Sequence, residues 1–308
     1  MAQQQTVTTP ALLAEAERQV RVRSLWGDAF RRLIRNRLAL AGGIVVLVFA
    51  AVAVLAPLAA PYDYAHIFTG KQLAPPSPSH WLGVDLVGRD TLSRVIYGAR
   101  TSLGVGLFTS AIVVVIGSVV GGVAALGGKY ADNLLMRFTD MVYAFPDLLF
   151  IILLQAVLSG TGLGNVMGGL LVVFLAIGMV NWVTLARIVR GQMLSLRERD
   201  YVLAARALGA TRRRIVVRHL LPNTLSPVIV VVTFAIPQAI FLEAALSFIG
   251  VGVRPPTASW GNMIYDGYAS ILATPWPILS PALALAITFL AFTFLGDGLR
   301  DALDPRTR

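Results

Sequence analysis

The chain has 308 residues, of which 56% are hydrophobic and 14% are charged, and uncharged runs longer than 18 residues recur along it. This composition excludes an ordinary soluble protein and indicates a membrane protein with several spans. The absence of cysteine excludes disulfides and cysteine-based sites, whereas the net charge of +10 leaves nucleic-acid binding open until the basic residues are placed.

The N-terminal region divides into two parts. Residues 1–23 are polar and rich in Gln and Thr at first, which predicts a disordered tail. Residues 24–37, SLWGDAFRRLIRNR, place apolar side chains on one face of a helix and arginines mostly opposite. This pattern predicts an amphipathic helix that lies on the membrane surface, with an extension of the first span as the alternative.

The uncharged runs predict six membrane spans of roughly 20 residues each, which is the length that crosses a bilayer. The helix-breaking sequence SGTGLGN divides the long run 141–186 into two spans. The predicted spans are 38–60, 101–128, two within 141–186, 224–250 and about 278–296. The fold class is therefore predicted to be an all-α membrane protein with six transmembrane helices.

The basic residues follow these spans. With the N-terminus inside, 21 of the 26 Lys and Arg residues fall on the inner segments. The positive-inside rule then predicts that both termini, including the tail 301–308, are cytoplasmic. The segment 61–100 is predicted to be extracytoplasmic, and nucleic acid is no longer needed to explain the charge.

Residues 200–222 form a charged, helix-prone island between apolar runs. Gly209 follows a short predicted helix as its left-handed C-terminal residue, and Thr211 is suited to cap a second helix that ends before Pro222. On the first helix one face carries Tyr201, Ala204, Ala205 and Leu208. A face of this kind is typical of a helix that lies in a partner's groove, and pairing of the basic loop with anionic lipid is the alternative.

The outer segments carry aromatic residues suited to docking an extracytoplasmic partner. The candidate contacts are Trp81, Asp85, Arg89 and Trp260. The alternative for the tryptophans is an aromatic belt at the headgroup level.

Three polar residues within the apolar runs are candidates for the translocation pathway. Glu243 is costly at bilayer depth, so it is expected to face the bundle or a cavity, unless it reaches water at the outer interface. Asn181 and Gln155 are candidates for the same pathway or for hydrogen bonds between helices. Gly117, Gly121 and Gly122 predict close helix packing.

Catalytic motifs are absent from the sequence. There is no HExxH or GxSxG, and the three histidines lie far apart. The stretch GGVAALGGKY resembles a phosphate-binding loop, but Val123 and Tyr130 occupy positions where that loop needs Gly and Ser or Thr. The chain is therefore predicted not to be an enzyme, and any nucleotide hydrolysis must come from another chain.

The spacing of the island resembles the EAA signature of ABC importer permeases, in which coupling helices contact the ATPase subunits. The residues that carry this resemblance or its predicted contact surface are Tyr201, Leu203, Ala204, Ala205, Leu208, Gly209, Leu221 and Pro222. Leu203 stands at the acidic position of the signature and His219 at a position that is usually apolar. Docking is therefore expected without an ion pair from position 203.

Two longer stretches, HWLGVDLVGRDTLSRVIYGARTSL at 80–103 and FLEAALSFIGVGVRPPTASWGNMI at 241–264, resemble the C-type permease subunit of dipeptide, oligopeptide and nickel importers. The resemblance implies a type I ABC importer permease fold with its core at 101–300, in the cell inner membrane. It also implies a homologous second permease, two cytosolic ATPases that bind ATP and Mg, an extracytoplasmic solute-binding protein, and no cofactor in this chain.

The solute itself is not fixed by these motifs. Peptides are the expected substrate, and nickel or another small solute is the alternative within the family. An ion-coupled secondary transporter is the alternative from another class, but Glu243 is its main support and no repeated halves are evident.

Overall fold

The computed structural model describes residues 25–303, and every regular element in this range is a helix. The helices in chain order are α2 (Leu25–Arg35), α3 (Arg37–Val54), α4 (Ala56–Ala59), α5 (Thr91–Leu126), α6 (Lys129–Tyr143), α7 (Asp147–Ser159), η1 (Gly162–Gly169), α8 (Leu170–Arg197), α9 (Asp200–Ala207), α10 (Arg212–Ile215), η2 (Val216–Leu220), α11 (Leu221–Phe248), α12 (Trp260–Tyr268) and α13 (Trp276–Leu303). The predicted tail 1–23 and most of the tail 301–308 lie outside the described residues.

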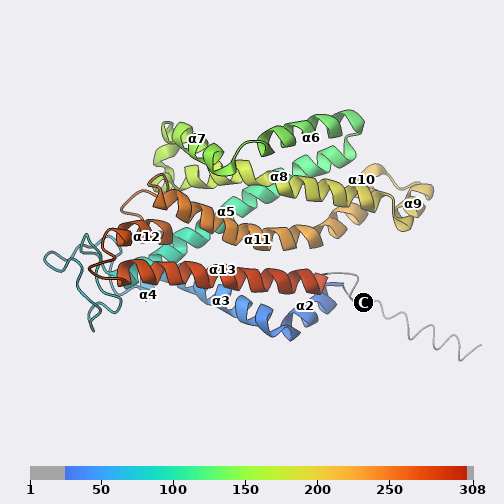
Figure 1. Cartoon of the computed structure of the whole chain (residues 1–308). Coiled ribbons are helices and arrows are strands. Elements are labelled where there is room, and N and C mark those ends of the chain that lie inside the picture. Colours follow the sequence, from blue (N-terminus) through green and yellow to red (C-terminus); the bar gives the residue numbers. More distant parts are fainter. Residues whose placement is uncertain (1–24, 304–308) are drawn as a thin grey trace, which may run out of the picture.

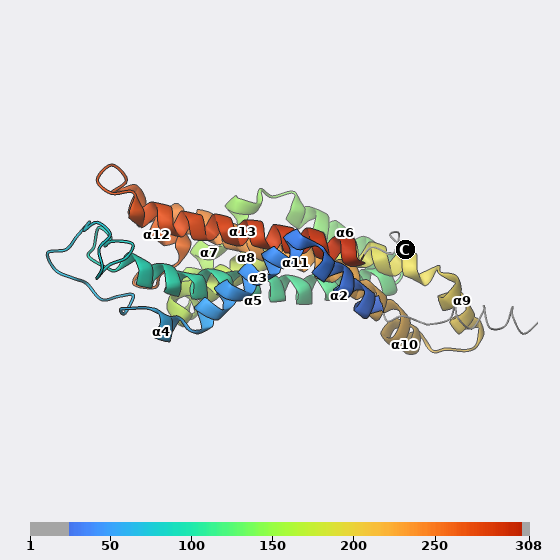
Figure 2. The ribbon, with the colours of Figure 1, turned by 90° about the horizontal axis from the view of Figure 1, so that it is seen from below.

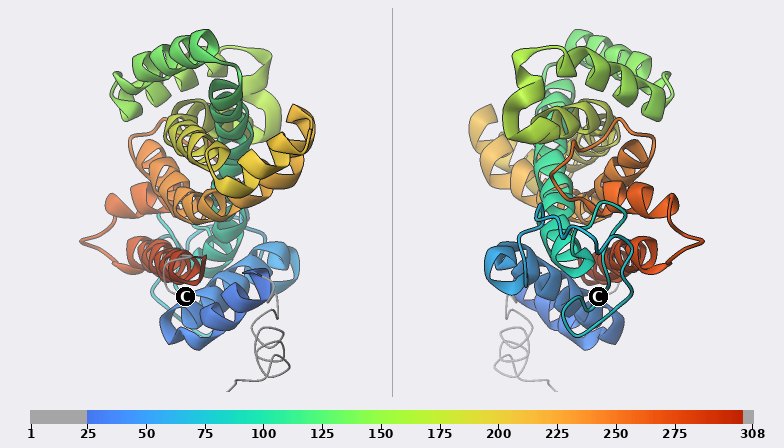
Figure 3. Two further views of the ribbon diagram at one scale, coloured as in Figure 1. Left: turned by 90° about the vertical axis from the view of Figure 1, so that its right-hand side faces the viewer. Right: turned by 90° about the vertical axis from the view of Figure 1, so that its left-hand side faces the viewer.

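Helix α5 runs through the middle of the bundle and packs against α3, α8, α11 and α13. Helices α2, α3 and α13 lie on one side of α5, and α6, α7 and α8 lie on the other (Figure 1, Figure 3). One end of the bundle carries α9 and α10, and the other carries α12 and the segment 60–90 (Figure 2). These are called the α9 end and the α12 end below.

Small residues let α5 approach α8 closely. A Cβ atom on Gly121 would lie 2.4 Å from the carbonyl oxygen of Ala186, and one on Gly117 would lie 2.9 Å from the Cβ of Leu185. This confirms the predicted role of Gly117 and Gly121, because backbones that pack without side chains between them gain close contact in a bilayer. Gly122 differs, since its nearest neighbour would be the Met193 side chain at 3.7 Å.

Five helices within residues 25–303 are long and apolar enough to cross a membrane, and the bent pair α6 and α7 is the sixth candidate. The predicted hairpin in 141–186 is thus only partly correct. Its break is present, because α7 ends at Ser159 and α8 begins at Leu170. However, α7 has 13 residues and meets α6 at 91°, so it is too short to cross alone. The bend falls at Pro146, where a helix interior is disfavoured.

The helix that contains the second predicted span begins before that span. Helix α5 starts at Thr91, ten residues before the expected start of the span at residue 101. The Asp90 side chain caps this helix by accepting a hydrogen bond from the backbone N–H of Ser93 at 2.8 Å. Arg94 lies in the part of α5 that precedes the predicted span. A charged residue is tolerated there because its charge is paired inside the protein.

The predicted break before Pro222 does not occur. Residues 212–248 continue as one apolar helix, in which Val216–Leu220 form a wider π-turn just before the proline. A wider turn removes the clash between the proline ring and the preceding carbonyls, and it needs no N–H at residue 222. The second half of the island and the membrane span that follows it therefore belong to one continuous helix.

The first helices differ slightly from expectation. Asn36 separates α2 from α3 and caps α3, because its side chain accepts the N–H groups of Leu38 and Ala39. Helix α2 is thus a separate helix and not an extension of the span. Its Ala29 is buried against the bundle, whereas Phe30 and Ile34 are exposed, as a surface-lying helix requires.

Candidate functional site

The predicted island forms a protrusion at the α9 end, built from α9, the turn at Gly209 and α10 (Figure 1). Gly209 has φ +81°, the left-handed conformation predicted for the helix end. Thr211 caps the next helix by accepting the N–H of Arg214 at 3.3 Å, again as predicted. Helix α9 begins at Asp200, and Arg199 is its N-cap residue.

A small apolar cluster anchors this protrusion. Val202, Ile215 and Leu220 are buried together, and Leu126 at the end of α5 packs against them. Sequence reasoning missed these three residues because each stands beside charged or exposed positions. The signal in the sequence was Val202, an apolar residue that lies next to the predicted outward face of α9.

The opposite face of α9 is open. Leu208 is 88% exposed, and Leu203 and Tyr201 are 46% and 43% exposed. Ala204 is exposed and Ala205 is half-buried, so the predicted small-residue face does point outward. Leu221 and Pro222 are also exposed at the start of α11. A short, anchored helix with an apolar outer face is an arrangement that can dock into a groove.

Two ion pairs brace the helices that lead to the protrusion. Arg187 of α8 contacts Asp140 of α6 at 2.8 Å, and Arg190 contacts Asp132 at 2.5 Å. Each arginine lies on the part of α8 nearest the α9 end. These pairs join α6 to the part of α8 that leads to α9.

The α12 end holds a buried ionic cluster. The Asp85 carboxylate accepts from Arg89 Nε at 2.8 Å and from Arg94 Nη1 at 2.5 Å. Asp266 on α12 accepts from the same two arginines at 2.9 and 3.2 Å. We call Asp85, Arg89, Arg94 and Asp266 the ionic cluster. It joins the outer segment, α5 and α12, because two carboxylates and two guanidiniums neutralise one another.

This geometry corrects the predicted docking surface. Asp85, Arg89 and Trp260 are 3%, 7% and 0% exposed, so their side chains pack mainly inside the protein, although Arg89 also lines the cavity beside Tyr265 and Tyr268. Trp81, in contrast, is 70% exposed. The sequence did not reveal Arg94 and Asp266, because Asp266 lies 172 residues from its arginine partner.

The pathway candidates have protein partners in this structure. Glu243 is fully buried, and its carboxylate accepts hydrogen bonds from Ser247, Ser259 and Ser102 at 2.7, 2.8 and 3.4 Å. It therefore joins α11 to α5 and to the start of α12, and in this conformation it neither reaches water nor lines an opening. Asn181 donates to the Ile177 carbonyl in its own helix, and buried Gln155 donates to the Val251 carbonyl.

Comparison with known proteins places this geometry in a family. Residues 90–308 match the model of the binding-protein-dependent transport system inner membrane component. Residues 24–76 match the N-terminal TM domain of oligopeptide transport permease C. The chain belongs to the binding-protein-dependent permease family. The implied type I ABC importer permease fold is thereby confirmed, as is the identification from the motifs at 80–103 and 241–264.

Similar permeases extend over almost the whole chain. The dipeptide transport system permease protein DppC of Bacillus subtilis is 44% identical and covers 91% of this chain and 86% of its own length. The oligopeptide transport system permease protein OppC of the same organism is 40% identical, with 92% and 91% covered. OppC of Escherichia coli is also 40% identical, with 94% of each chain covered.

Solved structures agree on the fold of this permease. Two inward-facing crystal forms of the MetNI methionine ABC transporter superpose with TM-scores of 0.57 and 0.55, at 18% and 19% identity. They cover 68% and 69% of this chain and 96% and 97% of the compared chains. The likeness is one of fold, and it leaves about a third of this chain unmatched.

Proposed function

We propose that this permease is one half of the translocation pathway of an ATP-driven importer. A homologous second permease supplies the other half, two ATPase subunits bind ATP and Mg, and an extracytoplasmic binding protein delivers the solute. This chain itself carries out no catalysis. The excess of arginines at the α9 end supports an orientation in the cell membrane with that end, and both termini, in the cytoplasm.

The observation that carries the proposal is the exposed apolar face of α9 on a firmly anchored base. Arg187 is the first charge after the apolar run of α8, and α9 begins 13 residues later. At 1.5 Å per residue this distance is about 20 Å, whereas the headgroup layer is about 5 to 8 Å thick. Helix α9 thus extends into solution, where its apolar face needs a protein partner.

The anchoring explains how work enters the bundle. Closure of the ATPase subunits moves α9, and the cluster of Val202, Ile215 and Leu220 keeps α9 from sliding against the base of α11. Because Arg212–Phe248 is a continuous helix, the movement reaches the membrane interior without a hinge at Pro222. The opening at the opposite membrane face changes as a consequence.

The solute is proposed to be a dipeptide or oligopeptide. The support is that curated relatives of 39 to 44% identity are named dipeptide or oligopeptide permeases. At the α12 end, exposed Trp81 and a cavity of about 420 Å³ beside Tyr265 and Tyr268 are suited to receive the binding protein. Asn181 and Gln155 are retained as pathway candidates for the assembled pair of permeases.

Replacement of Leu208 by aspartate tests the docking face. We expect at least about a tenfold loss of transport and of solute-stimulated ATP hydrolysis, because a carboxylate replaces the most exposed apolar contact of a small interface. Membrane insertion should stay unchanged, since Leu208 has no buried role. Reconstituted transporter with all subunits gives both rates.

The matched control is Leu272→Asp, which changes another highly exposed leucine at the α12 end. It should leave the ATPase subunits bound. Undiminished ATP turnover in Leu208→Asp would contradict docking through α9.

Proteoliposomes test the solute and the energy source together. We expect accumulation of a labelled dipeptide or tripeptide only when the second permease, the ATPases, ATP and the binding protein are present. Uptake of nickel but not of peptides would replace the proposed substrate. Accumulation driven by an ion gradient without ATPase subunits would replace the proposed class by a secondary transporter.

A further inference from the structure

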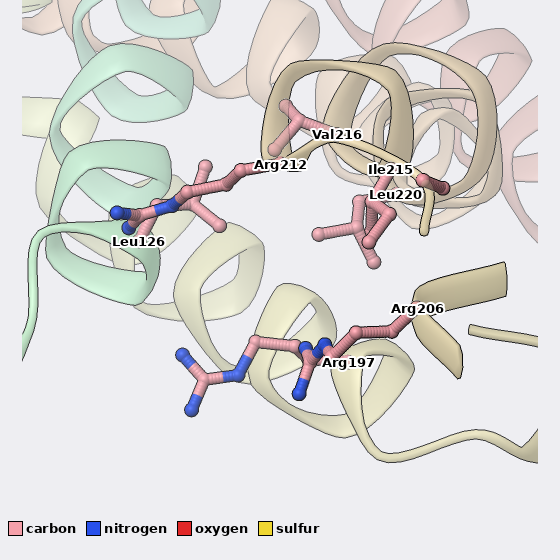
Figure 4. A pocket seen from close by; sticks show the side chains of 8 residues that line it. Leu126, Arg197, Arg206, Arg212, Ile215, Val216 and Leu220 are labelled. Carbon is pink, nitrogen blue, oxygen red and sulfur yellow. The ribbon is translucent and has the colours of Figure 1, made fainter. Parts of the chain in front are cut away.

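A cavity of about 330 Å³ lies at the base of the protrusion, between the ends of α5 and α8 and the first turn of α10. Its apolar floor is formed by Leu126, Ile215, Val216 and Leu220, and its charged rim by Arg197, Arg206 and Arg212. Figure 4 shows that Arg206 extends toward Arg197, while Arg212 extends toward Leu126 on the other side of the opening. Three guanidiniums from three helices therefore border one opening.

Within residues 25–303 no Asp or Glu lies within ion-pair distance of Arg197, Arg206 or Arg212. Arg197 has a single long donation of 3.4 Å to the carbonyl oxygen of Ala125. On the same helix, Arg187 and Arg190 are both paired with aspartates. The rim is thus an uncompensated positive site, which favours an anionic ligand.

The depth of the cavity decides what kind of anion can reach it. Arg197 lies ten residues beyond Arg187, where the uncharged part of α8 ends. Ten residues of helix measure about 15 Å, and a tilt of 20° shortens this distance only slightly. The headgroup layer is about 5 to 8 Å thick, so lipid phosphates end before the rim. Measured along α8, this distance favours a ligand that comes from solution.

We propose that this cavity binds a carboxylate side chain of the ATPase subunit that docks on α9. The inference rests on the proposed function, and it adds that the permease carries the positive charge of the contact and the ATPase the negative charge. A guanidinium matches a carboxylate through two parallel hydrogen bonds, and the apolar floor accommodates the methylene groups of Asp or Glu. Leu203 stands at the acidic position of the family signature, so position 203 adds no negative charge to this interface.

The test is charge reversal at two exposed rim positions. The transporter is assembled with its second permease in nanodiscs of neutral phosphatidylcholine, and the affinity for its ATPase subunits is measured at low and high salt. Arg206→Glu with Arg212→Glu should weaken binding about tenfold or more at low salt, and the dependence on salt should become smaller. Arg206→Lys with Arg212→Lys keeps the charges and should lose clearly less affinity for the ATPase subunits.

Two controls separate this inference from the docking proposal. Arg254→Glu reverses an exposed charge at the α12 end and should leave affinity unchanged. Leu208→Asp tests docking itself. If it weakens binding while the rim reversals do not, docking stands and the carboxylate contact is overturned.

A crosslinking experiment identifies the ligand directly. The chain has no cysteine, so Arg206→Cys provides a unique attachment point for a photoreactive label. We expect crosslinks to a segment of the ATPase that contains Asp or Glu, and reversal of that acid to Lys should restore affinity in the double glutamate variant. Crosslinks to lipid alone, or a rim effect seen only in anionic nanodiscs, would assign the cavity to phospholipid. Competition by millimolar inorganic phosphate with no acidic crosslink would assign it to a free anion, and either result overturns the proposal.

Discussion

Replacement of Asp85 by alanine is expected to lower the free energy of unfolding by about 3 to 5 kcal/mol, the cost of breaking a buried ion pair. Its Oδ1 accepts the backbone N–H groups of Val87, Gly88 and Arg89 at 2.8 to 2.9 Å. Its Oδ2 accepts from the guanidiniums of Arg89 and Arg94. The variant leaves two buried guanidiniums with one carboxylate and a turn without its acceptor, so the loss is large.

Unfolding in mixed micelles with increasing SDS measures this loss. Asp266→Ala is the matched control, because its side chain is 30% exposed and water can replace part of the lost contact. It should cost clearly less than the change at Asp85. Equal losses at the two positions would contradict the view that Asp85 is the centre of the ionic cluster.

Trp260→Ala is expected to destabilise the protein by a similar amount, about 3 to 5 kcal/mol, as is usual for a fully buried aromatic residue. Its ring meets Phe49 edge-on, with centroids 5.7 Å apart. It packs against Gly98, and its Nε1–H donates to the Val95 carbonyl at 3.1 Å. The variant leaves a large cavity where α3, α5 and α12 meet.

The same SDS titration, combined with binding-protein affinity, separates the two roles considered for Trp260. Trp260→Phe should recover most of the stability and lose only about 1 kcal/mol for the hydrogen bond. Trp81→Ala should leave stability unchanged, because that side chain is exposed. A Trp260→Ala variant with full stability but weakened binding-protein affinity would restore the original docking assignment.

The apolar spans were predictable because burial in lipid requires long uncharged runs, and such runs are visible in sequence. Their ends were less predictable. Helix α5 begins at Thr91 because Asp90 caps it, which is a local contact, and because Arg94 is paired with Asp266, which lies 172 residues away. The π-turn at Val216–Leu220 was not predicted either, since it lets a helix continue through Pro222 against the local preference.

In the protrusion, too, some features were predictable from the sequence and others were not. Gly209, Thr211 and the outward face of α9 were predicted, because caps and helical periodicity are local properties. The anchor of Val202, Ile215 and Leu220 and the cavity rimmed by Arg197, Arg206 and Arg212 were not. Each of these requires three helices to converge.

The sequence by itself determined that this chain is an all-α membrane protein, because hydropathy, charge asymmetry and helix signals are read along the chain. Its resemblance to permeases rested on the motifs at 80–103 and 241–264, and local helix signals marked the segment 200–222 that we propose for coupling. Only the tertiary structure decided the roles of its charged and aromatic residues. It placed Asp85, Arg89, Trp260 and Glu243 inside the bundle and left Trp81 exposed. The physical reason is that a buried charge needs partners, and some of those partners lie more than 100 residues away in the sequence.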